Sequence, residues 1–479
     1  MSISSALSNA LSGLTANARR AEIGAANIAN AQTDGYGRRI VETASASIGG
    51  ASAGVAVVGI TRSINTVILG DRRASDGALA GARQQAQVLR TIEQSIGSVD
   101  DPSSLSARLV DLELALEAAA ADPASDNRLR TGVRALKDLA LAVGQTARTI
   151  QTQRARADAD IAASVATLNA SLAQVEALNS DIGKAVATGR DPSALMDQRQ
   201  VSIDRISALV PVREVAQSNG KVALWTVGGA QLLDGAAPRI DFSPRSVITA
   251  DMTLASGALS GLSLSGTPMT QAVGRLTGGA LEAQFILRDE TLVAQQAAVD
   301  AIALDLVGRF SDPAVDPTLT PGAAGLLTDG GGAFIVGNEI GLAQRLSIHL
   351  SLDPAGANEI HRLRDGLAAT AHGEVGNPAQ LHRYLDVLSE QRAFGGGEAL
   401  SAFDRIARTS ERLSTDRLVA EQEVAFATAR RDSLHAAELE GGVDTDAELQ
   451  RLLVVEQAYA ANARVMQTID QMMSRLMEI

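Results

Sequence analysis

The stretch LQRLLVVEQAYAANARVMQTIDQMMSRLMEI, residues 449–479, decides how the two ends of this chain fold. Its apolar side chains recur at steps of three and four residues, which is the spacing of a coiled-coil seam. The seam positions are Leu452, Val455, Tyr459, Asn462, Met466, Ile469, Met473 and Leu476. Asn462 is the one polar member. A lone Asn in a seam can fix register and partner number at some cost in stability, and tolerated variation explains it equally well.

The other end of the chain carries a matching stripe. Between residues 3 and 28 the apolar positions again step by four and three, and they are Leu7, Leu11, Leu14, Ala18, Ala21, Ala25 and Ile28. These two narrow stripes predict that the ends pair with each other or with neighbouring copies of the chain. Isolated helices of this kind are marginal in water, so we expect both ends to be disordered in the free chain and to fold when a partner covers them.

Helical patterns also dominate the middle of the chain. They cover residues 73–98, 105–121, 127–187, 199–209, 280–310 and 378–438. Prolines after Asp101 and Asp122 separate the early helices. Residues 211–269 are instead rich in Val, Thr, Gly and Ser, with a hairpin-type turn at Asn219-Gly220, and they predict short strands among which Trp225 packs.

We therefore predict a mainly α fold, with paired terminal coiled-coil helices and a long helical bundle that carries an inserted β-rich domain. The expected units are a terminal helical domain of residues 1–60 and 440–479, a helical-bundle domain of residues 61–210 and 275–439, and a β-rich inserted domain of residues 211–274. Within the bundle domain, residues 312–342 are rich in Pro and Gly and are expected to be mainly loop.

Composition excludes several classes of protein. The 479 residues include 42 Lys and Arg against 55 Asp and Glu, for a net charge of −13, and no basic stripe interleaved with aromatic residues predicts nucleic-acid binding. We find no apolar run long enough to cross a bilayer and no cleavable signal peptide at the N-terminus. The chain has no cysteine, which excludes disulfides, thiolate zinc sites and cysteine nucleophiles.

No group of residues has the spacing of a catalytic, cofactor-binding or metal site. The five histidines are too far apart in the sequence for two metal ligands one helical turn apart. Carboxylate pairs such as Asp111 and Glu113 are better explained as a solvated helix face than as a general acid and base. We expect no enzyme activity, no catalytic residues, no cofactor and no metal.

The first helix leads into a distinctive motif. Asn27-Ile28-Ala29-Asn30 is followed by Thr33-Asp34-Gly35-Tyr36-Gly37-Arg38. Physically, the helix is expected to end near residue 30, the glycine at 35 allows a turn at positive φ, and the side chains at 36 and 38 are left to anchor the emerging chain. The string resembles the signature of flagellar rod, hook and hook-associated proteins. The matching positions are Asn27, Asn30, Thr33, Gly35, Tyr36 and Arg38.

The resemblance extends along the chain. Gln457, Tyr459, Asn462 and Ala463 stand where the terminal helix of this family carries its motif. The interior narrows the choice to the hook-associated members, which join hook to filament. The interior stretches that resemble them are residues 195–215, 219–235, 278–292 and 346–366.

The resemblance implies a structural subunit of the bacterial flagellum that joins hook to filament. In such proteins the terminal helices form an inner tube domain, the helical bundle forms the next layer and the β insert lies outermost. The residues expected to carry subunit packing are Leu7, Leu11, Leu14, Ile28, Leu452, Val455, Tyr459, Asn462, Met466, Ile469, Met473 and Leu476.

The resemblance also implies partners and a location. The partners are further copies of the chain in a ring, the hook protein, a second hook-filament junction protein and an export chaperone that binds the C-terminal helix. Neither nucleic acid nor membrane insertion is implied. The expected location is the flagellum, after type III export without a cleavable signal peptide.

Alternative functions remain. The alternative within the same family is another axial part, such as a hook or rod protein or the second junction protein. Hook proteins, however, usually carry more β structure between their helical ends. A peptidoglycan hydrolase attached to a rod domain would need a catalytic carboxylate in a sugar groove, which the sequence does not reveal. A type III translocator or helical adhesin would share the Ala-rich, Cys-free helices but would lack the paired termini and the motif of residues 33–38.

Overall fold

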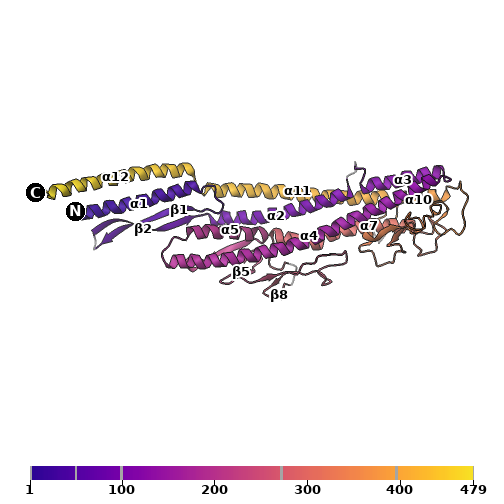
Figure 1. Cartoon of the computed structure of the whole chain (residues 1–479), viewed down its shortest axis with the longest axis horizontal. Helices are drawn as coiled ribbons and strands as arrows, with labels where there is room; N and C mark the ends of the chain where they lie inside the picture. The colour runs from indigo at the N-terminus through magenta and orange to yellow at the C-terminus, as the bar shows by residue number, and fades with distance from the viewer. Residues whose placement is uncertain (1–2, 49–50, 98–100, 270–272, 394–397, 478–479) are drawn as a thin grey trace.

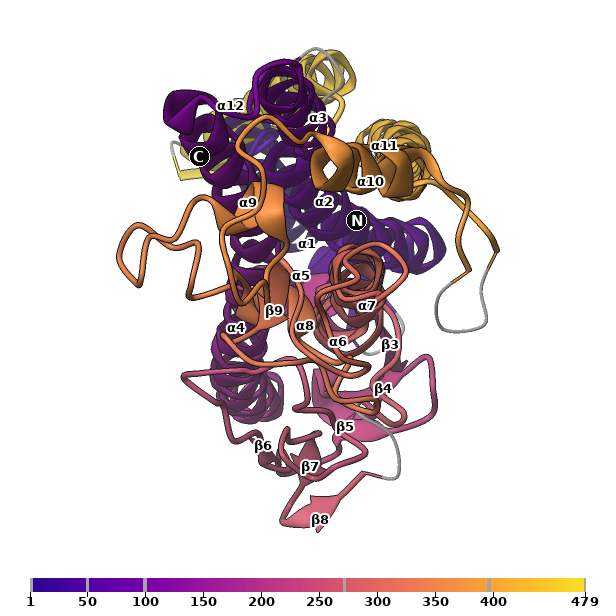
Figure 2. The ribbon, with the colours of Figure 1, turned by 90° about the vertical axis from the view of Figure 1, so that its right-hand side faces the viewer.

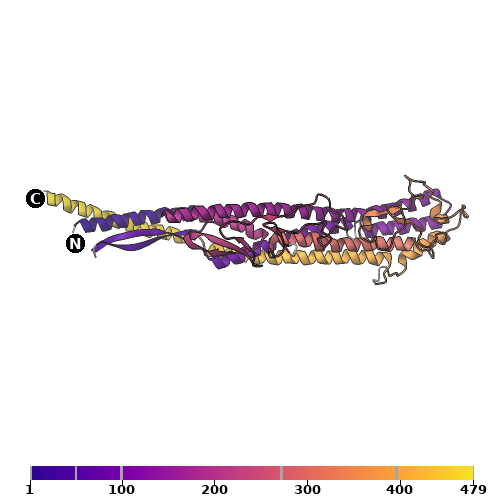
Figure 3. The same ribbon diagram turned by 90° about the horizontal axis from the view of Figure 1, so that it is seen from below.

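The chain forms a long rod with both termini at one pole (Figure 1). The computed structural model describes residues 3–48, 51–97, 101–269, 273–393 and 398–477. The first and last helices lie side by side at this pole, and the chain between them runs to the far pole and back (Figures 1 and 3). The predicted mainly α fold with paired terminal helices is confirmed.

Helices make up most of the rod. They are α1 Ile3–Ala29, α2 Thr66–Ile96, α3 Leu105–Ala121, α4 Asp126–Ala187, α5 Ser193–Leu209, α6 Gly279–Ile286, α7 Leu292–Phe310, α8 Leu342–Arg345, α9 Arg362–Asp365, α10 Ala379–Ser389, α11 Ala402–Glu440 and α12 Thr445–Met477, with a π turn η2 at Leu287–Thr291. The 62 residues of α4 span about 93 Å at the usual helical rise. The hydroxyls of Ser104 and Ser125 cap α3 and α4, directly after the breaks that the two Asp-Pro pairs predict.

Two apolar cores hold the bundle together. The larger core joins α2, α3, the first half of α4, α7 and α10 through fully buried side chains such as Leu109, Leu139 and Leu381. The smaller core joins the second half of α4 to α5, α6 and the strand insert, with Leu168 and Leu224 among its members. Among the described residues, neither core includes a side chain of α1 or α12. The two terminal helices therefore depend on other contacts.

The longest strands form a hairpin that the sequence analysis did not predict. β1, Arg38–Ile48, pairs antiparallel with β2, Ala51–Ser63, and the pairing shifts after Glu42 and after Ala46. The hairpin packs along α1 at the terminal pole (Figure 1). Its first strand, RRIVETASASI, has only a weak apolar alternation, because pairing with β2 and one side of α1 support it rather than a two-sided core.

Shorter strands build the insert and the far part of the rod. They are β3 Val212–Ala216, β4 Val222–Thr226, β5 Gln231–Leu233, β6 Ile240–Asp241, β7 Ser263–Leu264, β8 Thr267–Pro268, β9 Leu327–Asp329 and β10 Leu346–Ile348, with a short 3-10 turn η1 at Ser218–Gly220. The sheets have the orders β3-β4-β5, β6-β7-β8 and β10-β9. The predicted turn between β3 and β4 is confirmed, since Asn219 and Gly220 have φ angles of 57° and 73°. Trp225 lies in β4, paired with Arg213 and Gln231.

The strand insert lies beside the bundle and not at its far pole. Figure 1 places β5 and β8 alongside α4, whereas α3 and α10 lie at the far pole, and Figure 2 shows β6, β7 and β8 at the edge of the rod. The insert is thus peripheral across the rod but not distal along it, and its place as the outermost layer of an assembly stays a prediction. The reason is that its strands share the smaller core with the half of α4 that runs back toward the termini.

Two helical stretches correct another expectation from the sequence. Asp126–Ala187 and Gly279–Phe310 are each long and apolar enough, by length and composition, to cross a bilayer. In the described structure about half of each apolar window is buried against the rest of the chain, at 44% and 56%. The core helix of a protein without a membrane span meets the same criterion, so these two helices are weak evidence for a membrane.

Candidate assembly site at the terminal pole

The two terminal helices pack antiparallel through small residues of α1. A Cβ atom placed on Gly24 would lie 3.1 Å from Cδ2 of Leu452, and one placed on Gly13 would lie 2.9 Å from Nδ2 of Asn462. Residues later in α1 thus meet residues earlier in α12. The two glycines let the helices approach closely, and Asn462 sits over Gly13 in the middle of the contact.

The expected C-terminal seam contains the residues that face α1. Ile469 is 6% exposed, and Leu452, Val455, Asn462 and Met466 are half-buried. Tyr459 and Met473 are more open, at 44% and 46% exposed. The side chain of Leu476 lies outside the described part of the chain. Whether these residues pack against another subunit stays a prediction.

The expected N-terminal seam lies beside the contact with α12 and not within it. Leu7 and Leu11 are 36% and 53% exposed, while Leu14 and Ile28 are half-buried. The buried side of α1 is instead formed by Ala10, Ala16, Asn17, Ile23, Gly24 and Asn27. The structure thus leaves the leucine stripe of α1 largely uncovered in the single chain.

The motif after α1 is organised by the buried amide of Asn27. Its Nδ2 donates to the carbonyl oxygen of Arg39 at 2.9 Å, and its Oδ1 accepts from the Arg39 N–H at 3.0 Å and from the Tyr36 hydroxyl at 2.8 Å. The Arg39 guanidinium lies over the Tyr36 ring, 5.0 Å from its centroid. Burial raises the pKa of the Tyr36 phenol, which keeps it a hydrogen-bond donor. Asn27 therefore fixes where β1 leaves α1.

Asn30 and Thr33 shape the turn itself. Asn30 Nδ2 donates to the carbonyl oxygen of Ala26 at 2.9 Å, and the Thr33 N–H donates to the carbonyl oxygen of Asn30 at 2.9 Å. The Tyr36 N–H in turn donates to the carbonyl oxygen of Thr33 at 3.1 Å. These bonds satisfy backbone groups that the end of α1 would otherwise leave unpaired.

Gly35 brings the motif against α5. Its φ is 75°, and a Cβ atom there would lie 2.6 Å from Cγ2 of Val201 and 3.1 Å from the carbonyl oxygen of Asp197. The positive φ and the close approach both require glycine. This agrees with the turn at positive φ that the sequence predicts.

Asp197 of α5 joins the bundle to the terminal module, which consists of α1, the motif after it, the β1–β2 hairpin and α12. Its carboxylate accepts from the Gly37 N–H at 3.0 Å, from Nη2 of Arg39 at 3.0 Å and from Nε of Arg62 at 2.7 Å. Arg62 also donates to the carbonyl oxygen of Gly35 at 2.8 Å and to Gln200. One carboxylate thus holds the motif, β1 and β2 on the same helix.

Arg38 connects the motif to the last helix. Its Nε lies 2.8 Å from Oε1 of Glu448, whose side chain is 4% exposed, and Arg451 pairs with the same carboxylate. The expected anchoring roles of Tyr36 and Arg38 thus have defined partners. A cavity of about 530 Å³ remains between α1, β1 and the start of α12, so the packing of this module is incomplete in the single chain.

Several residues on both sides of this site are not predicted by the sequence pattern. Asp197, Arg62 and Glu448 were not singled out, because their partners are distant in the sequence. Exposed apolar side chains of α12 outside the predicted seam were also missed, and they are Leu449, Leu453, Val454, Val465 and Met472. The run of four consecutive apolar residues at 452–455 was the available signal, since such a run places apolar side chains on more than one face of a helix.

The described residues contain no group of three side chains able to hold a metal ion. His361 and His372 do come together, with ring centroids 4.2 Å apart. They lie near α9, well away from the terminal module.

Comparison with known families covers the same segments. The model described as Flagellar hook-associated protein FlgK helical domain matches residues 89–313, which span most of the bundle and the strand insert. The chain is similar to flagellar hook-associated proteins. The model Flagella basal body rod protein matches residues 7–36, which are α1 and its motif, and Flagellar basal body rod FlgEFG protein C-terminal matches residues 440–479, which contain α12. The resemblance seen in the sequence is confirmed at both ends and in the middle.

Individual relatives carry the same name. Flagellar hook-associated protein 1 of Escherichia coli (strain K12) is 26% identical over 247 residues, and the protein of that name from Salmonella typhimurium is equally similar. The matched region is 50% of this chain and 44% of each relative, so the match spans less than half the length of these proteins. The solved structure of the flagellar hook junction protein FlgK from Burkholderia pseudomallei aligns with 20% identity and a TM-score of 0.44, over 55% of this chain and 47% of that one.

Proposed function

We propose that this chain is a structural subunit of the bacterial flagellum that joins hook to filament and assembles by coupled folding of its terminal helices. The observation that carries the proposal is the shortage of buried apolar side chains in the terminal pair. α1 and α12 have 27 and 33 residues, yet their buried hydrophobic side chains in the described structure are Ala10, Ala16, Ile23 and Ile469.

This shortage has an energetic consequence. Each ordered residue loses about 1 to 2 kcal/mol of backbone entropy, whereas each fully buried isoleucine contributes about 1.5 to 3 kcal/mol. Two isoleucines leave most of the ordering cost to be offset by other surfaces. Exposed side chains such as Leu11, Leu453 and Val454, at 53%, 59% and 64%, are available for a neighbouring molecule to cover.

This surface and the similarity to hook-associated proteins support the proposed partners. Further copies of the chain cover the terminal stripes in a ring, with the hook protein on one side and a second hook-filament junction protein on the other. Before assembly, an export chaperone covers the C-terminal helix, whose exposed apolar side chains include Leu449, Val454 and Met472. The chain acts as a structural part and not as an enzyme, and it reaches the flagellum by type III export without a cleavable signal peptide.

The test is electron microscopy of a deletion strain, combined with an assay for flagellin in the medium. We expect finished hooks without filaments and monomeric flagellin in the medium. Rods without hooks would assign the chain to an earlier axial part, and intact flagella would refute the proposal.

Coupled folding has its own test. In dilute monomer, limited proteolysis should remove residues 3–29 and 445–477 while the bundle between them survives. Equal resistance of the ends and the bundle would show that the terminal helices fold without a partner.

A further inference from the structure

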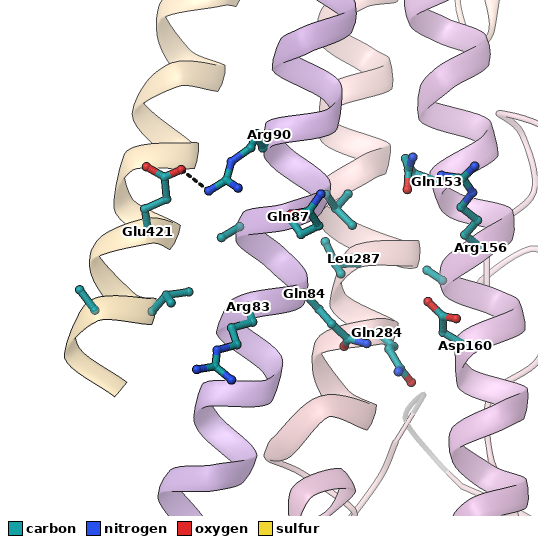
Figure 4. Close-up of a pocket in the computed structure, with 15 residues that line it drawn as sticks. Arg83, Gln84, Gln87, Arg90, Gln153, Arg156, Asp160, Gln284, Leu287 and Glu421 are labelled. Atoms are coloured by element: carbon teal, nitrogen blue, oxygen red, sulfur yellow. Dashed lines mark hydrogen bonds and ion pairs between the residues drawn. The ribbon is translucent and has the colours of Figure 1, made fainter. Parts of the chain in front are cut away.

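A groove of about 810 Å³ lies on the bundle, and within the described part of the chain its lining includes no residue of the terminal helices or of the motif (Figure 4). Side chains of α2, α4, α6, η2 and α11 line it. Its apolar lining includes Ala86, Leu287 and Val424. The proposed assembly of the terminal helices does not use this groove.

The floor of the groove contains hydrogen-bond acceptors without donors. Oε1 of Gln84 and Oε1 of Gln284 are both buried, and neither accepts a hydrogen bond from any described group. Gln284 is 4% exposed. In Figure 4 the side chain of Gln84 extends toward Gln284, and Asp160 lies near both on α4. Buried hydrogen-bond acceptors are normally paired, so a ligand with N–H donors would satisfy the two unpaired oxygens.

Charges at the rim narrow the chemistry of that ligand. Arg83, Arg90 and Arg156 line the groove, and of these Arg90 pairs with Glu421 at 2.8 Å. Asp160 and Glu421 also line the groove, so its three arginines stand against two carboxylates. The excess of positive charge disfavours an ammonium or guanidinium group as the donor. The ligand that fits has an apolar body, neutral N–H donors such as backbone amides, and a negative charge at its edge.

The chain itself carries a segment with this chemistry. Ile335, Val336 and Ile340, here called the apolar knob, are 71%, 88% and 61% exposed. Within the described structure the backbone N–H groups of Ile335 and Val336 donate to no protein group. Glu339 lies beside them, and a hydrogen bond from the Gly337 N–H at 2.9 Å lowers the pKa of its carboxyl, which keeps it ionised.

Hydrogen bonds within its own chain hold the knob in place. Arg345 binds Asp329 through Nε and Nη2 at 2.6 and 3.1 Å, and it donates to the carbonyl oxygens of Asn338 and Ile340 at 2.6 and 2.9 Å. The N–H of Gly341 is tied to the buried Asp300 of α7 at 2.8 Å. A surface loop that is already ordered loses little entropy when it binds.

We propose that the apolar knob of one copy inserts into the groove of a second copy. Val336 enters the apolar part of the groove, the free backbone N–H groups reach the carbonyl oxygens of Gln84 and Gln284, and Glu339 meets the arginine rim. Knob and groove are different surfaces, so the contact is heterologous, and contacts of this kind generate rings or open helical arrays. This inference rests on the proposed self-assembly and adds a contact between the bundles.

Because the chain has no cysteine, the contact can be tested by disulfide trapping. The full-length chain with V336C and Q87C would be expressed in the deletion strain, and purified hook-filament structures would be oxidised and run on a non-reducing gel. We expect a cross-linked dimer band at least ten-fold stronger than in either single variant. The matched control pairs Q87C with L350C, because Leu350 is 64% exposed but lies outside the knob, and it should give no such band.

The outcomes separate this inference from the proposed function. If the double variant is incorporated but does not cross-link, the knob-and-groove contact is overturned while the junction role stands. If the unmodified chain is not found in hook-filament structures, the proposed function fails and the inference fails with it. If the double variant is not incorporated, the single variant V336S tests the knob-and-groove contact instead. Val336 is almost fully exposed, so V336S should keep the unfolding midpoint of the native chain and lower incorporation at least three-fold, and unchanged incorporation would overturn the contact.

Discussion

Replacing Asp197 with alanine removes the carboxylate that holds the terminal module on the bundle. The side chain is 14% exposed, and it binds Nη2 of Arg39 at 3.0 Å and Nε of Arg62 at 2.7 Å. Removing one partner from a largely buried ion pair costs about 3 to 5 kcal/mol, mainly because the remaining charges lose their partner. Neither apolar core includes these residues. We therefore expect the substitution to favour local opening of the contact between α5 and the terminal module, here called the joint, while the bundle stays folded.

The size of this effect sets the assay. Because about 1.4 kcal/mol corresponds to a factor of ten, a loss of 3 kcal/mol raises the population of the open joint roughly 100-fold. Hydrogen exchange of the Gly37 amide, which donates directly to Asp197, should accelerate by that factor in D197A. The control is D181A, since Asp181 pairs with Lys184 on an open surface of α4, with side chains 55% and 68% exposed. Equal exchange of Gly37 in the native chain and D197A would refute the role of Asp197.

Three further predictions test other parts of the molecule. Met466→Asp should abolish incorporation into flagella and leave the unfolding midpoint of the bundle unchanged; normal junctions in this strain would contradict the assembly role of the seam. Gly35→Val should lower the free energy of unfolding of the joint in urea by about 2 kcal/mol or more. The reason is that φ is 75° and a Cβ atom would collide with Val201. Gly35→Asn should cost less, because Asn tolerates a positive φ better. Burial, with a smaller effect of Asp316, raises the pKa of Tyr384 well above its ordinary value of 10.0. Stability should therefore be fully present below pH 10 and fall above it by about 1.4 kcal/mol per pH unit, and calorimetry should find this part of the slope missing in Tyr384→Phe.

Some of the candidate site could be predicted from local pattern. Gly35 was expected to take a positive φ, Tyr36 and Arg38 were expected to act as anchors, and the structure supplies their partners Asn27 and Glu448. Such features are visible because a turn and a helix end depend on residues close in the sequence.

Contacts between distant segments were beyond the sequence. Asp197 is 160 residues from Gly37, and Glu448 is 410 residues from Arg38. Nothing in the local pattern marks one carboxylate among many as the partner of a given arginine. The β1–β2 hairpin was missed for a related reason, since its strands are defined by pairing with each other and by contact with α1.

The sequence alone determined the helical character of the chain, the apolar stripe of its last helix and the turn that follows its first helix. These follow from the period of apolar residues and from the backbone preferences of glycine and proline, which act over a few residues. Only the tertiary structure decided that α1 meets α12 through Gly13 and Gly24 and leaves Leu7 and Leu11 uncovered. The face that a helix buries depends on the shape of its partner, and small residues that permit close approach carry no apolar signal of their own.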